Sequence, residues 1–138
     1  MTKKLHIIMM LAITLALTAC TQTPEDMLIG TWQMKHATET VSVNGQSTTN
    51  ELPGYDNYIM EFVKEGYCAV TVRGERTVYT WYLVDDNTLL LTLENWVEDY
   101  SINELTKNHL VYNDTYNRLD TLTNTRTYYT YTFEFDKK

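Results

Sequence analysis

The sequence predicts an all-β, antiparallel fold, on two observations. Apolar and polar residues alternate along most of the chain, which is the period of a half-buried strand. Breaks between the alternating segments recur about every 8 to 12 residues, a spacing typical of an antiparallel sandwich or barrel and not of βαβ units. The glycines all fall at such breaks, where a positive φ is often needed: Gly30, Gly45, Gly54, Gly66 and Gly74.

The first residues have the pattern of a bacterial export signal. A basic start with Lys3 and Lys4 is followed by an apolar segment that ends at Leu17. This segment is shorter than the ~20 apolar residues that cross a bilayer. The stretch Leu17-Thr18-Ala19-Cys20 resembles the lipobox of bacterial lipoproteins, in which the cysteine thiol receives a diacylglycerol and the preceding peptide bond is cut. We therefore expect residues 1–19 to be a signal peptide and Cys20 to carry a lipid anchor.

This resemblance also predicts a location. Thr21 is not the aspartate that retains lipoproteins in the inner membrane of enteric bacteria, so we expect an outer-membrane lipoprotein of the bacterial cell envelope. Acidic residues just after the cysteine direct some lipoproteins to the cell surface. In this chain the first acidic residues after Cys20 are Glu25 and Asp26, which lie further from the cysteine. The periplasmic and surface-facing leaflets both stay open.

The charge of the mature chain excludes nucleic acid as a partner. Without Lys3 and Lys4, nine basic residues face eighteen acidic ones, a formal charge of about −9. Phosphates would be repelled by such a surface. Membrane contact is therefore expected from the acyl chains on Cys20 alone. After lipidation one thiol is left, Cys68, which has no disulfide partner and is predicted to be a small buried core residue.

One helix and nine strands are predicted in order. Thr23-Pro24-Glu25-Asp26 predicts a helix of one or two turns, with a Thr cap, Pro at the first position and acids in the first turn, within a tether of residues 20–27. Asn44-Gly45 predicts a type I′ hairpin, and Asn117 to Arg126 is expected to be a long polar break. The predicted strands are 31–43, 46–51, 57–63, 67–73, 76–84, 88–93, 97–105, 109–116 and 127–135. Nine strands are enough to close a barrel, which removes the edges of an open sheet.

At Gly30-Thr31-Trp32 the chain resembles the lipocalins, in which a tryptophan on the first strand closes the bottom of the barrel. Residues 28–32, 100–106 and 108–112 are similar to short lipocalin-like lipoproteins of Gram-negative bacteria. The resemblance implies an up-and-down β-barrel of about eight strands over residues 28–138, after a short N-terminal helix. It also implies an arginine stacked on Trp32, and Arg126 is the residue placed for it. The chain is shorter than the larger lipocalins and lacks their helix near the C-terminus. These differences argue against a cavity as large as theirs, and less against the barrel itself.

Alternation assigns the side chains that face the barrel interior. The inward sets are Trp32 and Met34; Tyr58, Met60 and Phe62; Cys68, Val70 and Val72; Tyr79, Trp81 and Leu83; and Tyr129, Tyr131, Phe133 and Phe135. A small barrel is either filled by such side chains or holds one small ligand. The candidate ligand-binding residues are Tyr58, Met60, Trp81, Tyr112, Tyr129 and Tyr131.

The chain contains eleven tyrosines and three phenylalanines, so most of its aromatic rings carry a hydroxyl group. A buried hydroxyl needs a partner, and tyrosines therefore favour places where one end is near water. Tyrosines at the barrel mouth favour an apolar or amphipathic small molecule as the ligand. Tyrosines on the outer wall, with Tyr128 as the candidate, favour the alternative: a filled barrel that acts as a protein-interaction module, accessory to an outer-membrane complex. Strand propensity alone also explains Tyr and Thr in these positions.

The sequence contains no motif of catalysis or of metal binding. A nucleophile elbow, a phosphate-binding loop and a His-Glu-x-x-His pair are all missing, and the two histidines of the mature chain, His36 and His109, lie on different predicted strands. Asp85-Asp86-Asn87 lacks the spaced ligands of a calcium loop and predicts a turn. We therefore expect a binding protein without cofactor, and no enzyme.

Overall fold

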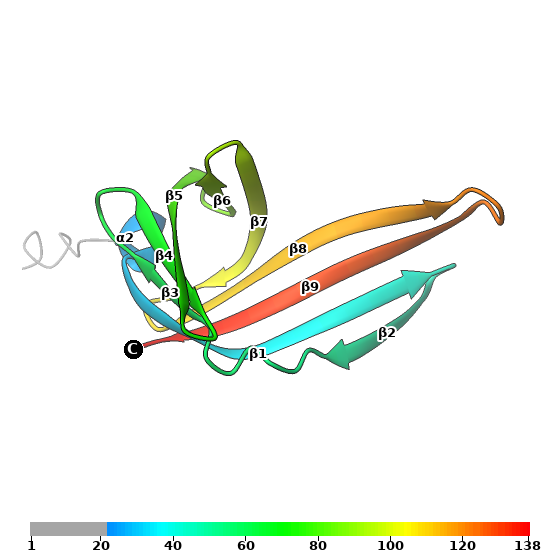
Figure 1. The fold of residues 1–138 in the computed structure, drawn as a ribbon, viewed down its shortest axis with the longest axis horizontal. Helices are drawn as coiled ribbons and strands as arrows, with labels where there is room; N and C mark the ends of the chain where they lie inside the picture. Colours follow the sequence, from blue (N-terminus) through cyan, green and yellow to red (C-terminus); the bar gives the residue numbers. More distant parts are fainter. Residues whose placement is uncertain (1–21) are drawn as a thin grey trace, which may run out of the picture.

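The computed structural model describes residues 22–138, which form one short helix and nine strands (Figure 1). The elements are α2 (Pro24–Leu28), β1 (Gly30–Val43), β2 (Gln46–Glu51), β3 (Ile59–Phe62), β4 (Tyr67–Val72), β5 (Glu75–Asp85), β6 (Thr88–Leu93), β7 (Trp96–Leu105), β8 (His109–Asp120) and β9 (Thr125–Lys137). The predicted signal peptide, residues 1–19, and the predicted lipid site at Cys20 lie outside the described residues.

Eight of the strands close into an antiparallel barrel, as the sequence predicts. Each strand from β3 to β8 pairs with the next one along the chain. The first residues of β1, Gly30 to Gln33, pair with β3, and β1 pairs along its other edge with β9. The ring β1-β3-β4-β5-β6-β7-β8-β9 is therefore continuous, and α2 precedes its first strand.

The strand β2 lies outside this ring, on a sheet that extends beyond the barrel. From Thr38 onward β1 pairs with β2, and β8 pairs with β7 only as far as Asn113. The far parts of β2, β1, β9 and β8 form a four-stranded sheet, which we call the blade (residues 38–51 and 114–132), and Figure 1 shows it projecting from the barrel. No residue of the blade is buried.

The prediction of a long polar break from Asn117 to Arg126 is wrong. β8 continues to Asp120 and β9 begins at Thr125, so only residues 121–124 form the turn. The Asp120 carboxylate accepts the backbone N–H of Leu122 at 2.9 Å in this turn. Polar side chains suit a loop when read along the chain, but here the backbone ladder between β8 and β9 satisfies the peptide groups in strand geometry.

The predicted turn and helix signals form as expected. Asn44 and Gly45 have φ of 51° and 80°, the left-handed pair that a type I′ hairpin requires. The Thr23 hydroxyl accepts the backbone N–H of Asp26 at 3.2 Å, and Pro24 is the first residue of α2. The helix ends after five residues, and it buries Leu28 against the barrel.

The core fills the half of the barrel next to α2, which we call the closed end. Trp32 is fully buried there, and its indole N–H donates to the Leu28 carbonyl at 2.7 Å. The buried apolar residues of the core are Leu28, Trp32, Met34, Ala37, Met60, Phe62, Cys68, Val70, Trp81, Leu89, Leu91, Ile102, Leu110, Tyr112 and Phe135. The sequence-predicted inward residues of β1, β3 and β4 therefore lie inside.

The cation over Trp32 is Lys137 and not Arg126. The Lys137 ammonium lies 4.9 Å from the indole centroid and donates to the Met27 carbonyl at 2.7 Å. Arg126 lies at the tip of the blade, where its guanidinium donates to the Asn117 side chain at 3.3 Å. β9 runs from the blade tip to the closed end, so only its last residues reach Trp32.

We predict that Lys137→Ala lowers the free energy of unfolding by about 1–2 kcal/mol, because it removes a cation–π contact and a hydrogen bond that ties α2 to the barrel. Arg126→Ala should change it by less than about 0.5 kcal/mol, as for an ordinary surface position. Urea unfolding of both variants measures the difference. A larger effect of Arg126→Ala would contradict the structure.

Candidate functional site

A cavity of about 890 Å³ opens at the barrel end opposite α2, and we call it the mouth cavity. Its rim includes the loop from Leu52 to Tyr55 and the β4–β5 turn at Arg73. Its volume is within the range of small-molecule sites. The lining residues are Leu52, Pro53, Gly54, Tyr55, Tyr58, Val70, Val72, Arg73, Glu75, Thr77, Tyr79, Glu98, Tyr100, Tyr112 and Phe133.

Aromatic rings form the floor of the mouth cavity. Tyr112 is 2% exposed, stacks on Phe135 with centroids 5.4 Å apart, and lies 5.4 Å from Phe133. Its ring is also 4.6 Å from that of Tyr100 on the neighbouring strand. The Tyr112 hydroxyl contacts the Met60 sulfur at 3.5 Å, so Met60 lies below the floor. The barrel is therefore filled below Tyr112 and open above it.

Two of the six sequence-predicted ligand residues line the mouth cavity, namely Tyr58 and Tyr112. Met60 lies under the floor. Trp81 packs deeper, with its ring 5.3 Å from Phe62 and its N–H donating to the Val63 carbonyl.

Tyr129 and Tyr131 lie on the blade, outside the barrel. Alternation places them on the same side of β9 as Phe133, but β9 has left the barrel at these positions, because β8 no longer pairs with β7 beyond Asn113. Their assignment to the barrel interior is therefore wrong, and the reason is the length of β8 and β9.

Several lining residues were not among the predicted candidates. Tyr79 belongs to the same inward set as Trp81 on β5. On β7 the same two-residue period places Glu98 and Tyr100 on the side of Ile102. Alternation along the sequence could therefore have identified all three residues. Tyr55 lies in the loop between β2 and β3, where no periodicity applies.

The buried phenol groups of Tyr58 and Tyr100 in the mouth cavity stay protonated. Burial raises the pKa of Tyr58 well above its ordinary range, and burial together with the hydrogen bond to Glu98 does the same for Tyr100. The Tyr100 hydroxyl donates to the Glu98 carboxylate, which also accepts the Trp96 N–H at 3.1 Å. The wall therefore offers aromatic faces and neutral hydroxyls, with one carboxylate held in place at the rim.

A row of tyrosines continues from the mouth cavity onto the blade. Tyr131 stacks at 6.4 Å from Phe133, Tyr116 lies 5.9 Å from Tyr131, and Tyr129 stacks on Tyr116 at 4.6 Å and 10°. The Tyr131 hydroxyl donates to Glu39 at 2.8 Å. This tyrosine row (Tyr116, Tyr129 and Tyr131) extends the aromatic surface of the cavity beyond the barrel.

The thiol of Cys68 takes no part in this site. It is fully buried below the mouth, and burial raises its pKa to about 12. At neutral pH it is a thiol and not a thiolate, so it behaves as a small apolar core residue, as predicted.

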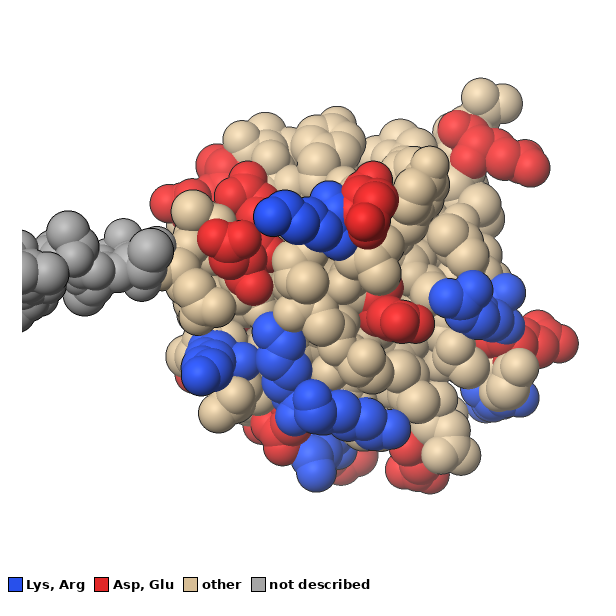
Figure 2. Space-filling model, turned by 90° about the vertical axis from the view of Figure 1, so that its left-hand side faces the viewer, with Lys and Arg blue, Asp and Glu red and all other residues tan. Residues whose placement is uncertain are grey.

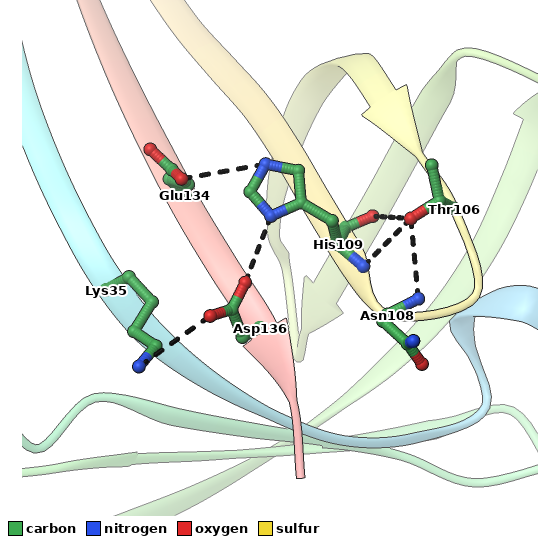
Figure 3. A network of polar contacts seen from close by, with 6 residues as sticks. All are labelled: Lys35, Thr106, Asn108, His109, Glu134 and Asp136. Atoms are coloured by element: carbon green, nitrogen blue, oxygen red, sulfur yellow. Dashed lines mark hydrogen bonds and ion pairs between the residues drawn. The ribbon is translucent and has the colours of Figure 1, made fainter.

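A polar cluster lies away from the mouth cavity, on the strand pair β8–β9 near the closed end. Figure 3 shows His109 between Glu134 and Asp136, with Lys35 on the other side of Asp136. The His109 Nδ1 lies 3.1 Å from Asp136 and its Nε2 lies 3.6 Å from Glu134, while the Lys35 ammonium lies 3.7 Å from Asp136. These contacts join β1, β8 and β9 near the closed end, and we assign them a role in stability.

Charges of both signs are mixed at the closed end. Figure 2 shows a band of basic side chains there, with acidic side chains on both sides of it. Within residues 22–138, no three His, Cys, Asp or Glu side chains are arranged to hold a metal ion. In the same residues no helix has the length and apolar character that crossing a membrane requires.

Sequence comparisons add no identification. No protein-family model matches the chain, and no curated protein matches it. The fold and the mouth cavity therefore carry the functional inference.

We predict a pH-dependent contribution of His109 to stability. The hydrogen bond that His109 donates to the Asp136 carboxylate raises the pKa of His109, so the folded protein holds this proton more tightly than the unfolded chain. The stabilisation is complete below about pH 6.5, the ordinary histidine value, and is lost as the pH rises through the raised value.

Urea unfolding between about pH 6 and pH 8.5 should therefore show a falling free energy of unfolding in the unmodified protein. The decline should be absent in His109→Gln and retained in His36→Gln, which leaves the cluster intact. An equal decline in His109→Gln would show that another group is responsible.

Proposed function

We propose that this chain is an envelope-anchored, lipocalin-like lipoprotein that binds a small apolar or amphipathic molecule in its barrel. One observation carries the proposal: a closed eight-strand barrel is filled at one end and has an aromatic-walled cavity of about 890 Å³ at the other. Small-molecule sites combine this kind of apolar concave wall with a few fixed polar groups.

The chemistry of the wall supports an amphipathic ligand. Tyr58, Tyr79, Tyr100 and Tyr112 each present an aromatic ring and a hydroxyl, and Val70 and Val72 add aliphatic surface. A purely apolar molecule would cover polar groups that line the cavity, such as the Tyr79 hydroxyl and the Glu98 carboxylate, without a polar contact of its own to them, which costs free energy in a dry site. A molecule with an apolar body and a polar end satisfies both parts.

The arrangement of the ends supports a role at a membrane surface. The helix α2, which follows the predicted lipid site at Cys20, is tied to the closed end by Trp32 and Lys137. A lipid anchor on Cys20 would thus attach the protein near its closed end and leave the mouth cavity free to receive a ligand. We place this anchor in the outer membrane on the grounds of residue Thr21.

We predict that Tyr79→Ala weakens binding of the apolar fluorescent probe N-phenyl-1-naphthylamine by about tenfold, because it removes a ring from the cavity wall. The matched control is Tyr82→Ala on the same strand, where the side chain is 54% exposed and faces outward. Probe titration of both variants and of the unmodified protein measures the effect. Equal affinity of the two variants, or no binding by the unmodified protein, would refute the site.

The blade favours a second candidate function, a protein-interaction module. Both faces of this four-stranded sheet are open, and Tyr128 is 53% exposed on the face opposite the tyrosine row. Exposed aromatic side chains of this kind are enriched at protein interfaces. The partner would be an envelope protein, such as a subunit of an outer-membrane complex.

For this second candidate, we expect Tyr128→Ala to abolish copurification of an envelope protein with the tagged lipoprotein, while thermal stability stays nearly unchanged. The matched control is Tyr67→Ala, which removes a tyrosine that is 51% exposed on β4. Loss of the copurifying protein in both variants would show that the Tyr128 face is not the specific surface. Quantitative mass spectrometry of crosslinked complexes provides the readout.

A further inference from the structure

Two acidic side chains without basic partners lie at one side of the barrel mouth, on the neighbouring strands β7 and β8. Glu98 lines the mouth cavity from β7, and Asp114 follows Tyr112 by two residues on β8, on the same side of the strand. Within residues 22–138, neither carboxylate forms an ion pair with a Lys, Arg or His side chain. The ion pairs of the protein lie elsewhere on its surface.

The position of Asp114 joins the cavity to the blade. Across the strands, Asp114 pairs with Tyr131, and Tyr131 pairs with Glu39. Asp114, Tyr131 and Glu39 therefore form one row on the face that carries the tyrosine row. This acidic row lies directly beyond the ring of Phe133, the last cavity-lining residue of β9.

The local field is unfavourable for the ionised carboxylate of Asp114. Burial and the nearby charges of Asp99 and Glu98 raise the pKa of Asp114. The charge of Glu98 also contributes to raising the pKa values of Tyr58, Tyr79 and Tyr100. Because no basic side chain of residues 22–138 pairs with Glu98 or Asp114, the mouth carries uncompensated negative charge on its β7–β8 side.

The aromatic rings next to these carboxylates add to the attraction for a cation. Tyr100 and Tyr112 lie 4.6 Å apart at the cavity floor, beside Glu98, and Tyr116 and Tyr131 lie beside Asp114. The face of an aromatic ring attracts an ammonium group, and the attraction grows when water is excluded. The basic side chain that lines the cavity, Arg73, lies at the β4–β5 turn, where Glu75 also lines the wall.

We propose that the ligand is a cationic amphiphile, with its apolar part in the mouth cavity and its ammonium group between Glu98 and Asp114. This inference rests on the proposed function and names the chemical class of its ligand. An amphiphile that ends in a carboxylate, such as a fatty acid, would place its charge against Glu98 and Asp114 and be repelled.

Two dansyl probes of equal chain length test the proposal on the mature protein. One is an undecyl chain that ends in a primary ammonium, and the other is the same chain ending in a carboxylate. We expect the ammonium probe to bind roughly tenfold more tightly, as one favourable charge contact implies. High salt should reduce this preference, because the site is partly open to solvent.

The variants Glu98→Gln and Asp114→Asn keep the shape of each side chain and remove its charge. Each should lower the preference for the ammonium probe over the carboxylate probe severalfold. The matched control Glu104→Gln removes an exposed carboxylate of β7 near the closed end and should leave the preference unchanged. Circular dichroism establishes that the variants fold. If either does not, the salt dependence of the preference in the unmodified protein decides, since a preference that comes from charge must fall as the salt concentration rises.

The outcomes separate the two proposals. Equal binding of both dansyl probes, or tighter binding of the carboxylate, overturns the cationic ligand and leaves the binding function in place. No binding of either dansyl probe or of the naphthylamine overturns the binding function as well. A preference that survives in both charge-neutral variants shows that Glu98 and Asp114 do not hold the ammonium group.

Discussion

The pairing of β1 with β9 is the interaction on which the rest of the structure depends. The paired residues extend from Trp32 opposite Lys137 to Val43 opposite Thr127, and the register shifts once, at a bulge after Met34. At one end this ladder closes the barrel and brings Lys137 over Trp32. At the other end it continues past the mouth and forms the centre of the blade. A barrel closed by shorter strands would have the same core but no tyrosine row beside its mouth.

The mouth cavity exists because the core is unevenly distributed along the barrel axis. Trp32, Phe62 and Trp81 fill the closed end, and Tyr112 forms the boundary of the filled part. Above it, tyrosines replace the aliphatic side chains that would fill the interior. A phenol in a wide barrel must place its hydroxyl near water or a partner, so a tyrosine-rich interior favours an open mouth. Two carboxylates, Glu98 and Asp114, lie at that mouth, and in our proposal they set the electrostatic preference of the site.

Much of this fold was predictable from local sequence signals, and part of the site was not. Asn44-Gly45, the Thr23 cap and the alternation of Met60 and Phe62 each act within a few residues, and each predicted structure forms. Tyr129 and Tyr131 obey the same alternation, but it specifies the side of a strand and not whether the strand is still in the barrel. The prediction that Arg126 stacks on Trp32 was wrong for a similar reason, since the distance between the two residues depends on where β9 begins.

The sequence by itself determined the succession of strands, the inward sides of β1, β3 and β4 and the buried tryptophan, because hydrophobic periodicity and turn chemistry are local properties of the chain. The export and lipid-anchor predictions also rest on sequence alone, in residues 1–20. Only the tertiary structure decided which strands close the ring, how far β8 and β9 extend, and that Lys137 covers Trp32. These depend on pairing between residues distant in the chain, as between β1 and β9, and no short segment specifies its partner in isolation.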